Sequence, residues 1–149
     1  SQKLKVVDKD IKRPWGGFFV ISEDNSQDFA NIYFNGLNTE ELKISGKLSP
    51  KILIIAPNKR LSWQYHHRRS EIWKVVGGQI KVVTSHDDIE RKEQILKEGD
   101  EIRLSKGERH RIIGMDEYAV VAEIWIHTDK DNPSDENDIV RIQDDFDRN

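Results

Sequence analysis

The sequence contains no cysteine and no long apolar run. Without cysteine, disulfides and thiolate zinc sites are excluded, so any metal must be held by nitrogen and oxygen atoms. The longest apolar runs, residues 51–56 and 119–126, are far too short to span a bilayer. The amino-terminal stretch, residues 1–10, has no apolar signal segment. These absences predict a soluble protein with no membrane contact and fit a reducing cytoplasm.

A basic surface is also lacking. The formal net charge is −3, and no stripe of basic residues is interleaved with aromatic ones. A nucleic-acid partner is therefore not expected. A chain of 149 residues fits a single domain, residues 1–149, that is long enough to bury a core.

Short β-type segments fill the chain from residue 51 onward. They are rich in Val, Ile, Trp or Tyr, several alternate apolar with polar residues, and Gly, Pro or Asn residues separate them. The predicted strands are residues 52–56, 61–67, 71–76, 79–84, 100–104, 109–113 and 118–127. Short strands at this spacing predict an all-β sandwich or barrel with a core over residues 51–127.

The two ends of the chain differ from this core. Residues 13–20 indicate a turn that leads into a strand, and Asn38 or Thr39 could cap a short helix ahead of Glu40. Residues 13–50 are therefore predicted to form an amino-terminal strand and a helical insertion. Residues 128–149 form an acidic carboxyl-terminal segment.

Residues 61–71 read LSWQYHHRRSE and carry several potential metal ligands. Side chains two positions apart on a strand share a face, so Gln64 and His66 point one way and His67 the other. Glu71 begins the next predicted strand, and His110 lies near the start of another. Such a set of N and O ligands suits Zn²⁺, Mn²⁺, Fe²⁺ or Ni²⁺. The spacing alone leaves two interpretations open, a metal site that uses His66 or a polar turn with two adjacent histidines.

The spacing of these residues resembles the two motifs of the cupin superfamily, G-x5-H-x-H-x(3,4)-E-x6-G and G-x5-P-x-G-x2-H-x3-N. Every spacing is kept, although several identities differ. The matching residues are Asn58, Gln64, His66, Glu71 and Gly78, then Gly99, Ser105, Gly107, His110 and Gly114. This resemblance implies a double-stranded β-helix, the jelly-roll barrel of the cupins.

The chain is similar, more narrowly, to the cupin domain of type II phosphomannose isomerases, which is usually fused to mannose-1-phosphate guanylyltransferase. The motifs that carry this likeness are RPWGGF at 13–18, LSWQYHHRRSEIW at 61–73, GERHR at 107–111 and ENDIVRIQDDFDR at 136–148. Arg68 and Ile72 stand where those enzymes have histidine. No Gly-rich phosphate loop with a Lys or Arg is present, so GDP-mannose synthesis is not expected.

The resemblance implies one divalent metal ion held by Gln64, His66, Glu71 and His110. Zinc is the first choice, with Mn, Fe, Ni or Co as alternatives. The implied reaction is an aldose–ketose isomerisation of a phosphosugar through an enediol, most simply mannose 6-phosphate to fructose 6-phosphate. Two alternatives remain. One is an isomerase or epimerase of another sugar phosphate or nucleotide sugar in polysaccharide synthesis. The other is a non-catalytic cupin that binds a sugar or metal and regulates a partner.

Arginine suits a phosphate group because its planar guanidinium can donate two parallel hydrogen bonds. The candidate substrate-binding residues are Arg13, Arg69, Lys74 and Arg111. The candidate catalytic residues are Glu71, Arg111 and Arg141.

A homodimer is expected on two grounds. Leu61, Trp63 and Tyr65 are predicted to form an apolar face opposite the metal ligands, and this face needs cover from another sheet or subunit. Relatives in the family are habitually dimeric.

Overall fold

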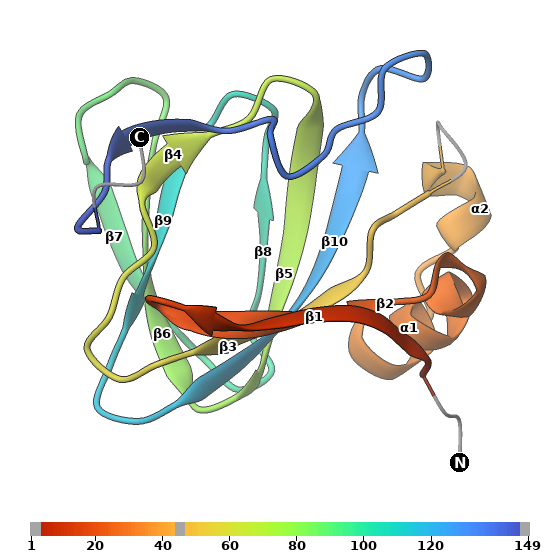
Figure 1. Cartoon of the computed structure of the whole chain (residues 1–149), viewed down its shortest axis with the longest axis horizontal. Coiled ribbons are helices and arrows are strands. Elements are labelled where there is room, and N and C mark those ends of the chain that lie inside the picture. Colours follow the sequence, from red (N-terminus) through yellow and green to blue (C-terminus); the bar gives the residue numbers. More distant parts are fainter. Residues whose placement is uncertain (1–3, 44–46, 147–149) are drawn as a thin grey trace.

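The computed structural model describes residues 4–43 and 47–146, and it consists mainly of two antiparallel sheets (Figure 1). In spatial order, the six strands described for the first sheet are β1 (Val6–Arg13), β2 (Gly16–Ile21), β3 (Lys51–Ile55), β10 (Ala119–His127), β5 (Arg69–Gly77) and β8 (Glu101–Leu104). The five described for the second are β11 (Val140–Gln143), β4 (Trp63–Tyr65), β9 (Arg109–Gly114), β6 (Gln79–Ser85) and β7 (Lys92–Lys97). This architecture confirms the predicted all-β jelly roll.

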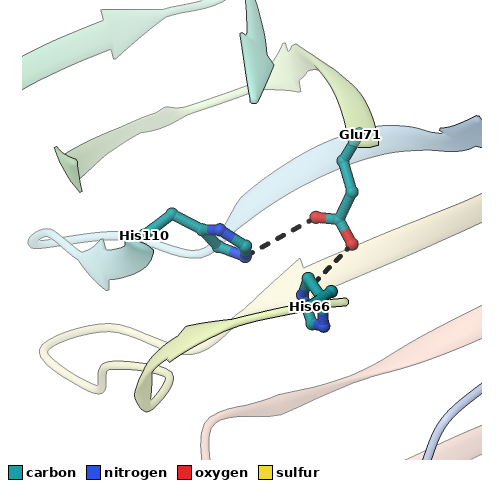
Figure 2. A group of neighbouring side chains, drawn as sticks. All are labelled: His66, Glu71 and His110. Carbon is teal, nitrogen blue, oxygen red and sulfur yellow. Dashed lines mark ion pairs between the residues drawn. The ribbon is translucent and has the colours of Figure 1, made fainter. Parts of the chain in front are cut away.

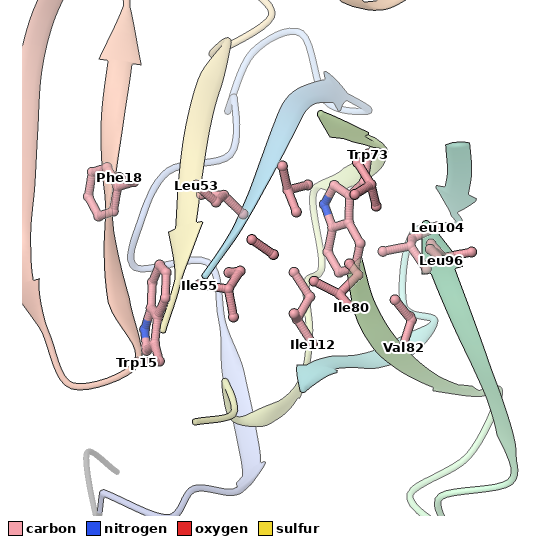
Figure 3. Packing of buried hydrophobic residues seen from close by; sticks show 13 residues of the cluster. Trp15, Phe18, Leu53, Ile55, Trp73, Ile80, Val82, Leu96, Leu104 and Ile112 are labelled. Atoms are coloured by element: carbon pink, nitrogen blue, oxygen red, sulfur yellow. The ribbon is translucent and has the colours of Figure 1, made fainter. Parts of the chain in front are cut away.

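The main core lies between the two sheets (Figure 3). Trp73 and Val75 of β5 meet Ile80 and Val82 of β6, and all four are buried. Alternation along each strand points these residues inward. The residues that complete this cluster are Trp15, Phe18, Leu53, Ile55, Leu96, Leu104, Ile112, Ala119 and Val121.

A second core lies on the outer face of the first sheet. Helices α1 (Ser26–Tyr33) and α2 (Thr39–Leu42) sit beside this sheet (Figure 1). Phe29 of α1 is fully buried and belongs to the same cluster as Ile72 of β5 and Ile124 of β10. Strands β5 and β10 are therefore covered on both faces, which explains why they read as nearly continuous apolar runs. None of the helices in the described ranges is long and apolar enough to cross a bilayer.

The predicted strands of the core are all present, with ends that differ by a few residues. The Asn38 cap is confirmed as well, since its side chain accepts a hydrogen bond from the N–H of Glu40 at 3.1 Å. Strands β1, β7 and β11 and helix α1 were not predicted. Strand β7 reads KEQILK, and Leu96 is its one buried residue, so it lacks the apolar alternation that identifies a strand. The last three residues of the acidic segment, 147–149, lie outside the described residues.

The apolar face expected opposite the metal ligands is covered by the chain itself. Trp63 is 2% exposed, and its indole N–H donates to the carbonyl oxygen of Asp88 at 2.8 Å. The guanidinium of Arg109 covers the ring of Tyr65, with its Cζ 3.8 Å from the ring centroid. Leu61 packs against the main core instead. The homodimer thus stays a prediction, without support from this face.

Gly114 stands where the cupin motif has asparagine, and the structure gives a reason. A Cβ atom at this position would lie 2.3 Å from the carbonyl oxygen of Ala56 and 3.0 Å from that of Lys59. We therefore expect Gly114→Asn, which restores the motif residue, to lower the free energy of unfolding by about 2–3 kcal/mol in urea denaturation. Gly77→Ala is the matched control, because its Cβ would lie 3.9 Å from the nearest atom of Val120 and should cost little. Equal stability of the two variants would contradict this packing.

Candidate metal and substrate site

Three buried side chains converge in one pocket (Figure 2): His66, directly after β4, Glu71 of β5 and His110 of β9. Glu71 of β5 lies between two histidines: its Oε2 is 3.5 Å from Nε2 of His66, and its Oε1 is 3.7 Å from Nε2 of His110. The candidate ligand atoms of all three residues lie within 4.8 Å of one another. Gln64, the fourth predicted ligand, is also buried, lines the pocket and pairs with His110 in the sheet register.

Both histidines direct an unprotonated nitrogen, Nε2, at the carboxylate of Glu71. Nδ1 of His66 lies 2.7 Å from the carbonyl oxygen of Asp138, and Nδ1 of His110 lies 3.2 Å from that of Glu108. A carbonyl oxygen only accepts, so Nδ1 carries the proton and Nε2 keeps its lone pair. Burial lowers the pKa of His66 to about 3, and it also lowers the pKa of His110, so both rings are neutral at pH 7.

This donor set fits a divalent metal ion. Metal-binding histidines commonly donate their other ring N–H to a carbonyl oxygen, which fixes the orientation of the ring. Burial opposes the charge of Glu71, but the neighbouring Arg69 guanidinium outweighs it and holds the pKa of this carboxyl well below its ordinary value. Two neutral imidazoles, one carboxylate and the amide oxygen of Gln64 would then be the ligands. Such a set suits Zn²⁺, Mn²⁺, Fe²⁺, Ni²⁺ or Co²⁺.

The carboxyl-terminal segment fixes this end of the pocket. Asp138 is buried, and its two carboxylate oxygens accept the backbone N–H groups of His67 and Arg68, each at 2.9 Å. The hydroxyl of Ser134 donates to the same carboxylate at 2.6 Å. These bonds, with the one to the ring of His66, tie residues 66–68 to a segment that follows them by about seventy positions. The acidic tail thus positions a predicted ligand.

A second buried carboxylate, Glu123 of β10, lines the same pocket. It stands between Lys51 of β3 and Trp73 of β5 in the sheet register. Its oxygens accept the indole N–H groups of Trp125 at 2.7 Å and Trp73 at 2.9 Å. Burial and the charge of Glu71 raise the pKa of Glu123 to about 7, despite the opposing effect of Lys51. Glu123 can therefore both take up and release a proton near neutral pH.

Cationic side chains also line this pocket. Arg13 and Arg141, both predicted from the terminal motifs, are among its lining residues. Arg13 also pairs with Asp10 at 3.0 Å. Lys51 is 5% exposed and forms an ion pair with Glu136 of the carboxyl-terminal segment. The pocket therefore offers several positive charges to an anionic ligand.

Two predicted site residues do not reach the pocket. Arg111 was expected to bind substrate and take part in catalysis, but neighbours on a strand point to opposite faces, so it points away from His110. Its guanidinium donates to the carbonyl oxygen of Leu61 at 2.9 Å and to the side chain of Gln143. It therefore anchors the carboxyl-terminal strand.

Lys74 was expected to face the cavity together with Ile72. The pocket face of β5 instead carries Glu71 and Trp73, and Ile72 packs in the second core. Lys74 consequently lies on the outer face of the sheet and is not part of the pocket lining. Arg69, by contrast, shares the face of Glu71 and does line the pocket.

Glu123 and Lys51 are two buried charged residues of the pocket lining that were not predicted. Each is the one charged residue of its apolar run, residues 119–126 and 51–56. A charge within a run that is otherwise apolar is costly to bury unless it has partners or a function. That exception in the pattern is the signal in the sequence that could have identified both residues.

The buried titratable groups predict a loss of stability in mild acid for the metal-free protein. Folding lowers the pKa of His66 to about 3 and that of the fully buried His127 to about 4, in both cases chiefly through burial. Below pH 6.5 the unfolded chain then binds more protons than the folded one at these histidines, so they make the protein less stable as the pH is lowered. Glu123 acts in the opposite sense between pH 7 and 4.5, because its folded pKa is raised.

When the pH falls from 7 to 5, each of these histidines should lower the free energy of unfolding by about 2 kcal/mol, and Glu123 should raise it by about 2 kcal/mol. The net loss is therefore about 2 kcal/mol, and His110 adds to it. Urea denaturation at both pH values measures the difference. Stability that is unchanged or higher at pH 5 would contradict neutral, buried histidines.

Comparison with protein families gives a match over most of the chain. The family described as mannose-6-phosphate isomerase C-terminal matches residues 38–144, which include all four predicted ligands and Glu123. No curated protein matches the chain.

Solved structures share the fold at low sequence identity. The capsular polysaccharide assembling protein CapF from Staphylococcus aureus superposes with a TM-score of 0.63 at 15% identity, over 96% of this chain and 32% of CapF. The DMSP lyase DddQ from Ruegeria pomeroyi gives 0.50 at 16% identity, over 63% of this chain and 42% of that one. Drosophila melanogaster CENP-C, bound to CAL1, gives 0.55 at 13% identity, over 79% and 75%.

The chain spans about a third of the length of CapF, and all three likenesses concern the fold. The family match is the more specific finding, since it covers more than two thirds of the chain and contains the whole donor set. This chain therefore belongs to the mannose-6-phosphate isomerase C-terminal family and has the cupin fold.

Proposed function

We propose that the pocket isomerises a phosphosugar in a metal-dependent reaction, most simply mannose 6-phosphate to fructose 6-phosphate. The observation that carries the proposal is the place of Glu123, a buried carboxylate with a pKa of about 7 next to the donor set of His66, Glu71 and His110. A proton carrier beside a metal site is what an aldose–ketose isomerisation requires.

Gln64, His66, Glu71 and His110 would hold the divalent ion, with zinc as the first choice. When bound, the ion supplies positive charge that stabilises negative charge on the oxygens of C1 and C2. Only one of these four ligands is anionic, so the site keeps a net positive charge.

The proton transfer is assigned to Glu123. Its carboxylate removes the proton from C2 of the aldose to give an enediolate with its charge on O1. The proton of the O2 hydroxyl passes to O1, and the protonated Glu123 returns a proton to C1 to give the ketose. The indole N–H groups of Trp73 and Trp125 fix both oxygens, so the carboxylate keeps one orientation in both half-reactions. A pKa near the working pH suits a group that must act first as base and then as acid.

The phosphate is assigned to the cations of the pocket. Arg13, Lys51 and Arg141 line it, and guanidinium groups bind phosphate through parallel N–H donors. Arg111 and Lys74, which face elsewhere, have no part in this assignment.

The experiment is a coupled assay on metal-depleted protein reloaded with Zn²⁺, Mn²⁺, Fe²⁺, Ni²⁺ or Co²⁺. Mannose 6-phosphate and a panel of other hexose and pentose phosphates are the substrates. We expect isomer formation with at least one metal and none in a chelator. No isomer from any substrate with any metal would refute the proposal.

A nucleotide sugar used in polysaccharide assembly is the second candidate substrate. It is favoured by the likeness to CapF, which is called a capsular polysaccharide assembling protein and superposes on 96% of this chain. The same assay with UDP-, GDP- and dTDP-sugars distinguishes the two. A non-catalytic cupin is the third candidate. It would form no product from any sugar phosphate or nucleotide sugar, while still binding a sugar or metal.

A further inference from the structure

The guanidinium of Arg69 lies among the predicted metal ligands and contacts two of them. Its Nε donates to Oε2 of Glu71 at 2.7 Å, and its Nη2 lies 3.2 Å from Nε2 of His66. The side chains of Arg69 and Glu71 are 7% and 3% exposed, so water does not screen the pair. A positive charge therefore already neutralises the one carboxylate of the metal site.

Arg69 is held in this place from three further sides. Its Nη1 donates to the hydroxyl of Ser134 at 2.9 Å and to the carbonyl oxygen of Asp135 at 3.1 Å. Its Cζ lies 3.5 Å from the centre of the Trp125 ring, a cation–π contact. These partners account for both Nη1 protons and for one face of the guanidinium plane. The side chain is thus fixed, and its position is a built feature of the site.

Arg69 and a metal ion need the same atom. Nδ1 of His66 is committed to the carbonyl oxygen of Asp138, so Nε2 has a single lone pair. That lone pair can accept an N–H of Arg69 or bind a metal, but it cannot do both. A divalent ion at Glu71 would also be repelled by the guanidinium that stays bound to Oε2.

We propose that Arg69 is a resident cation that competes with the divalent metal for His66 and Glu71 and thereby sets the metal affinity of the site. Metal binding would take the lone pair of His66 Nε2 away from Nη2 of Arg69, while the guanidinium keeps its bonds to Glu71, Ser134 and Asp135. In the metal-free protein Arg69 keeps the buried carboxylate paired, so the pocket stays folded without an ion. The role is that of a positioning residue, and it rests on the metal site of the proposed function.

The test measures metal affinity without substrate. Co²⁺, whose visible spectrum reports its ligands, is titrated into metal-depleted wild type, Arg69→Met and Arg69→Lys, and Zn²⁺ is then measured by competition. Removal of a like charge from a buried site should tighten binding by about 10- to 100-fold in Arg69→Met. Arg69→Lys keeps the charge but loses the planar fork, so its affinity should fall between the other two.

Arg68→Met is the matched control. Arg68 is the adjacent arginine and loses the same charge on substitution. It pairs with the carboxylates of Asp135 at 3.6 Å and Asp138 at 3.9 Å, neither of which is a predicted metal ligand. Its metal affinity should stay within about twofold of wild type. Arg69→Met leaves Glu71 unpaired and is expected to be less stable than wild type, so Arg69→Lys is the deciding variant if Arg69→Met does not fold.

The outcomes separate this inference from the proposed function. Tighter binding in the Arg69 variants with an unchanged Arg68→Met supports it. Equal or weaker binding in the Arg69 variants, with wild type binding metal, overturns the inference alone and makes Arg69 a support of Glu71. If no variant and no wild-type protein binds Co²⁺ or Zn²⁺, the inference and the metal-dependent function fall together.

Discussion

Replacing either His66 or His110 by alanine is expected to abolish metal binding under conditions in which wild type is saturated. Loss of a residue that only orients a ligand costs about 10- to 100-fold in metal affinity, so loss of a ligand should cost more, about 1000-fold. The two substitutions should act alike, because both rings direct Nε2 at the same carboxylate, that of Glu71. Metal content after dialysis and titration with Co²⁺ measure the effect.

His67→Ala is the control for this experiment. His67 follows β4, is exposed, does not line the pocket and lies against the ring of Tyr65, with centroids 5.3 Å apart. Its loss should leave metal affinity unchanged. Loss of metal from only one of the His66 and His110 variants, or an equal loss from His67→Ala, would contradict a shared site.

The second large effect is expected from Glu123→Gln. A positioned acid–base group contributes about 100- to 10,000-fold to a rate, so kcat should fall by about 1000-fold. KM for the sugar phosphate and the affinity for metal should change little, because Glu123 is not assigned to either. The amide oxygen can still accept one of the two indole N–H groups, so the pocket should keep its shape.

Two checks make this prediction specific. In wild type, kcat/KM should rise with pH up to the pKa of Glu123 and then level off, because the ionised carboxylate is the proposed base. Glu93→Gln is the control, since Glu93 is exposed on β7 and pairs with Lys81 at 3.3 Å. An unchanged kcat in Glu123→Gln would remove this residue from the mechanism.

Strand alternation predicted much of the site from the sequence. It placed Gln64 and His66 on one face and His67 on the other, and the structure agrees. This works because the side-chain period of a strand is fixed by backbone geometry and needs no knowledge of packing. The same rule places Arg111 opposite His110, so its assignment to the site neglected the alternation.

Other features depend on tertiary contacts that a local pattern does not contain. The prediction for Lys74 was wrong because β5 is covered on both faces. Ile72 packs against the helices and not into the cavity, and Lys74 shares the face of Ile72. Glu123 was missed because a strand buried on both sides reads as a nearly continuous apolar run. Such a run has no alternation that shows which face its one charged residue takes. The pairing of Asp138 with residues 67 and 68 joins distant parts of the chain and leaves no periodic trace.

The proposed reaction moves a proton between two carbons of a phosphosugar when metal is bound. The most direct measurement is NMR of mannose 6-phosphate incubated in D₂O with the metal-loaded protein. We expect fructose 6-phosphate to form and deuterium to accumulate at its C1 as the reaction stands at equilibrium, because the proton on Glu123 exchanges with solvent. Absence of product, or equilibrium reached with no deuterium in either sugar, would contradict the account.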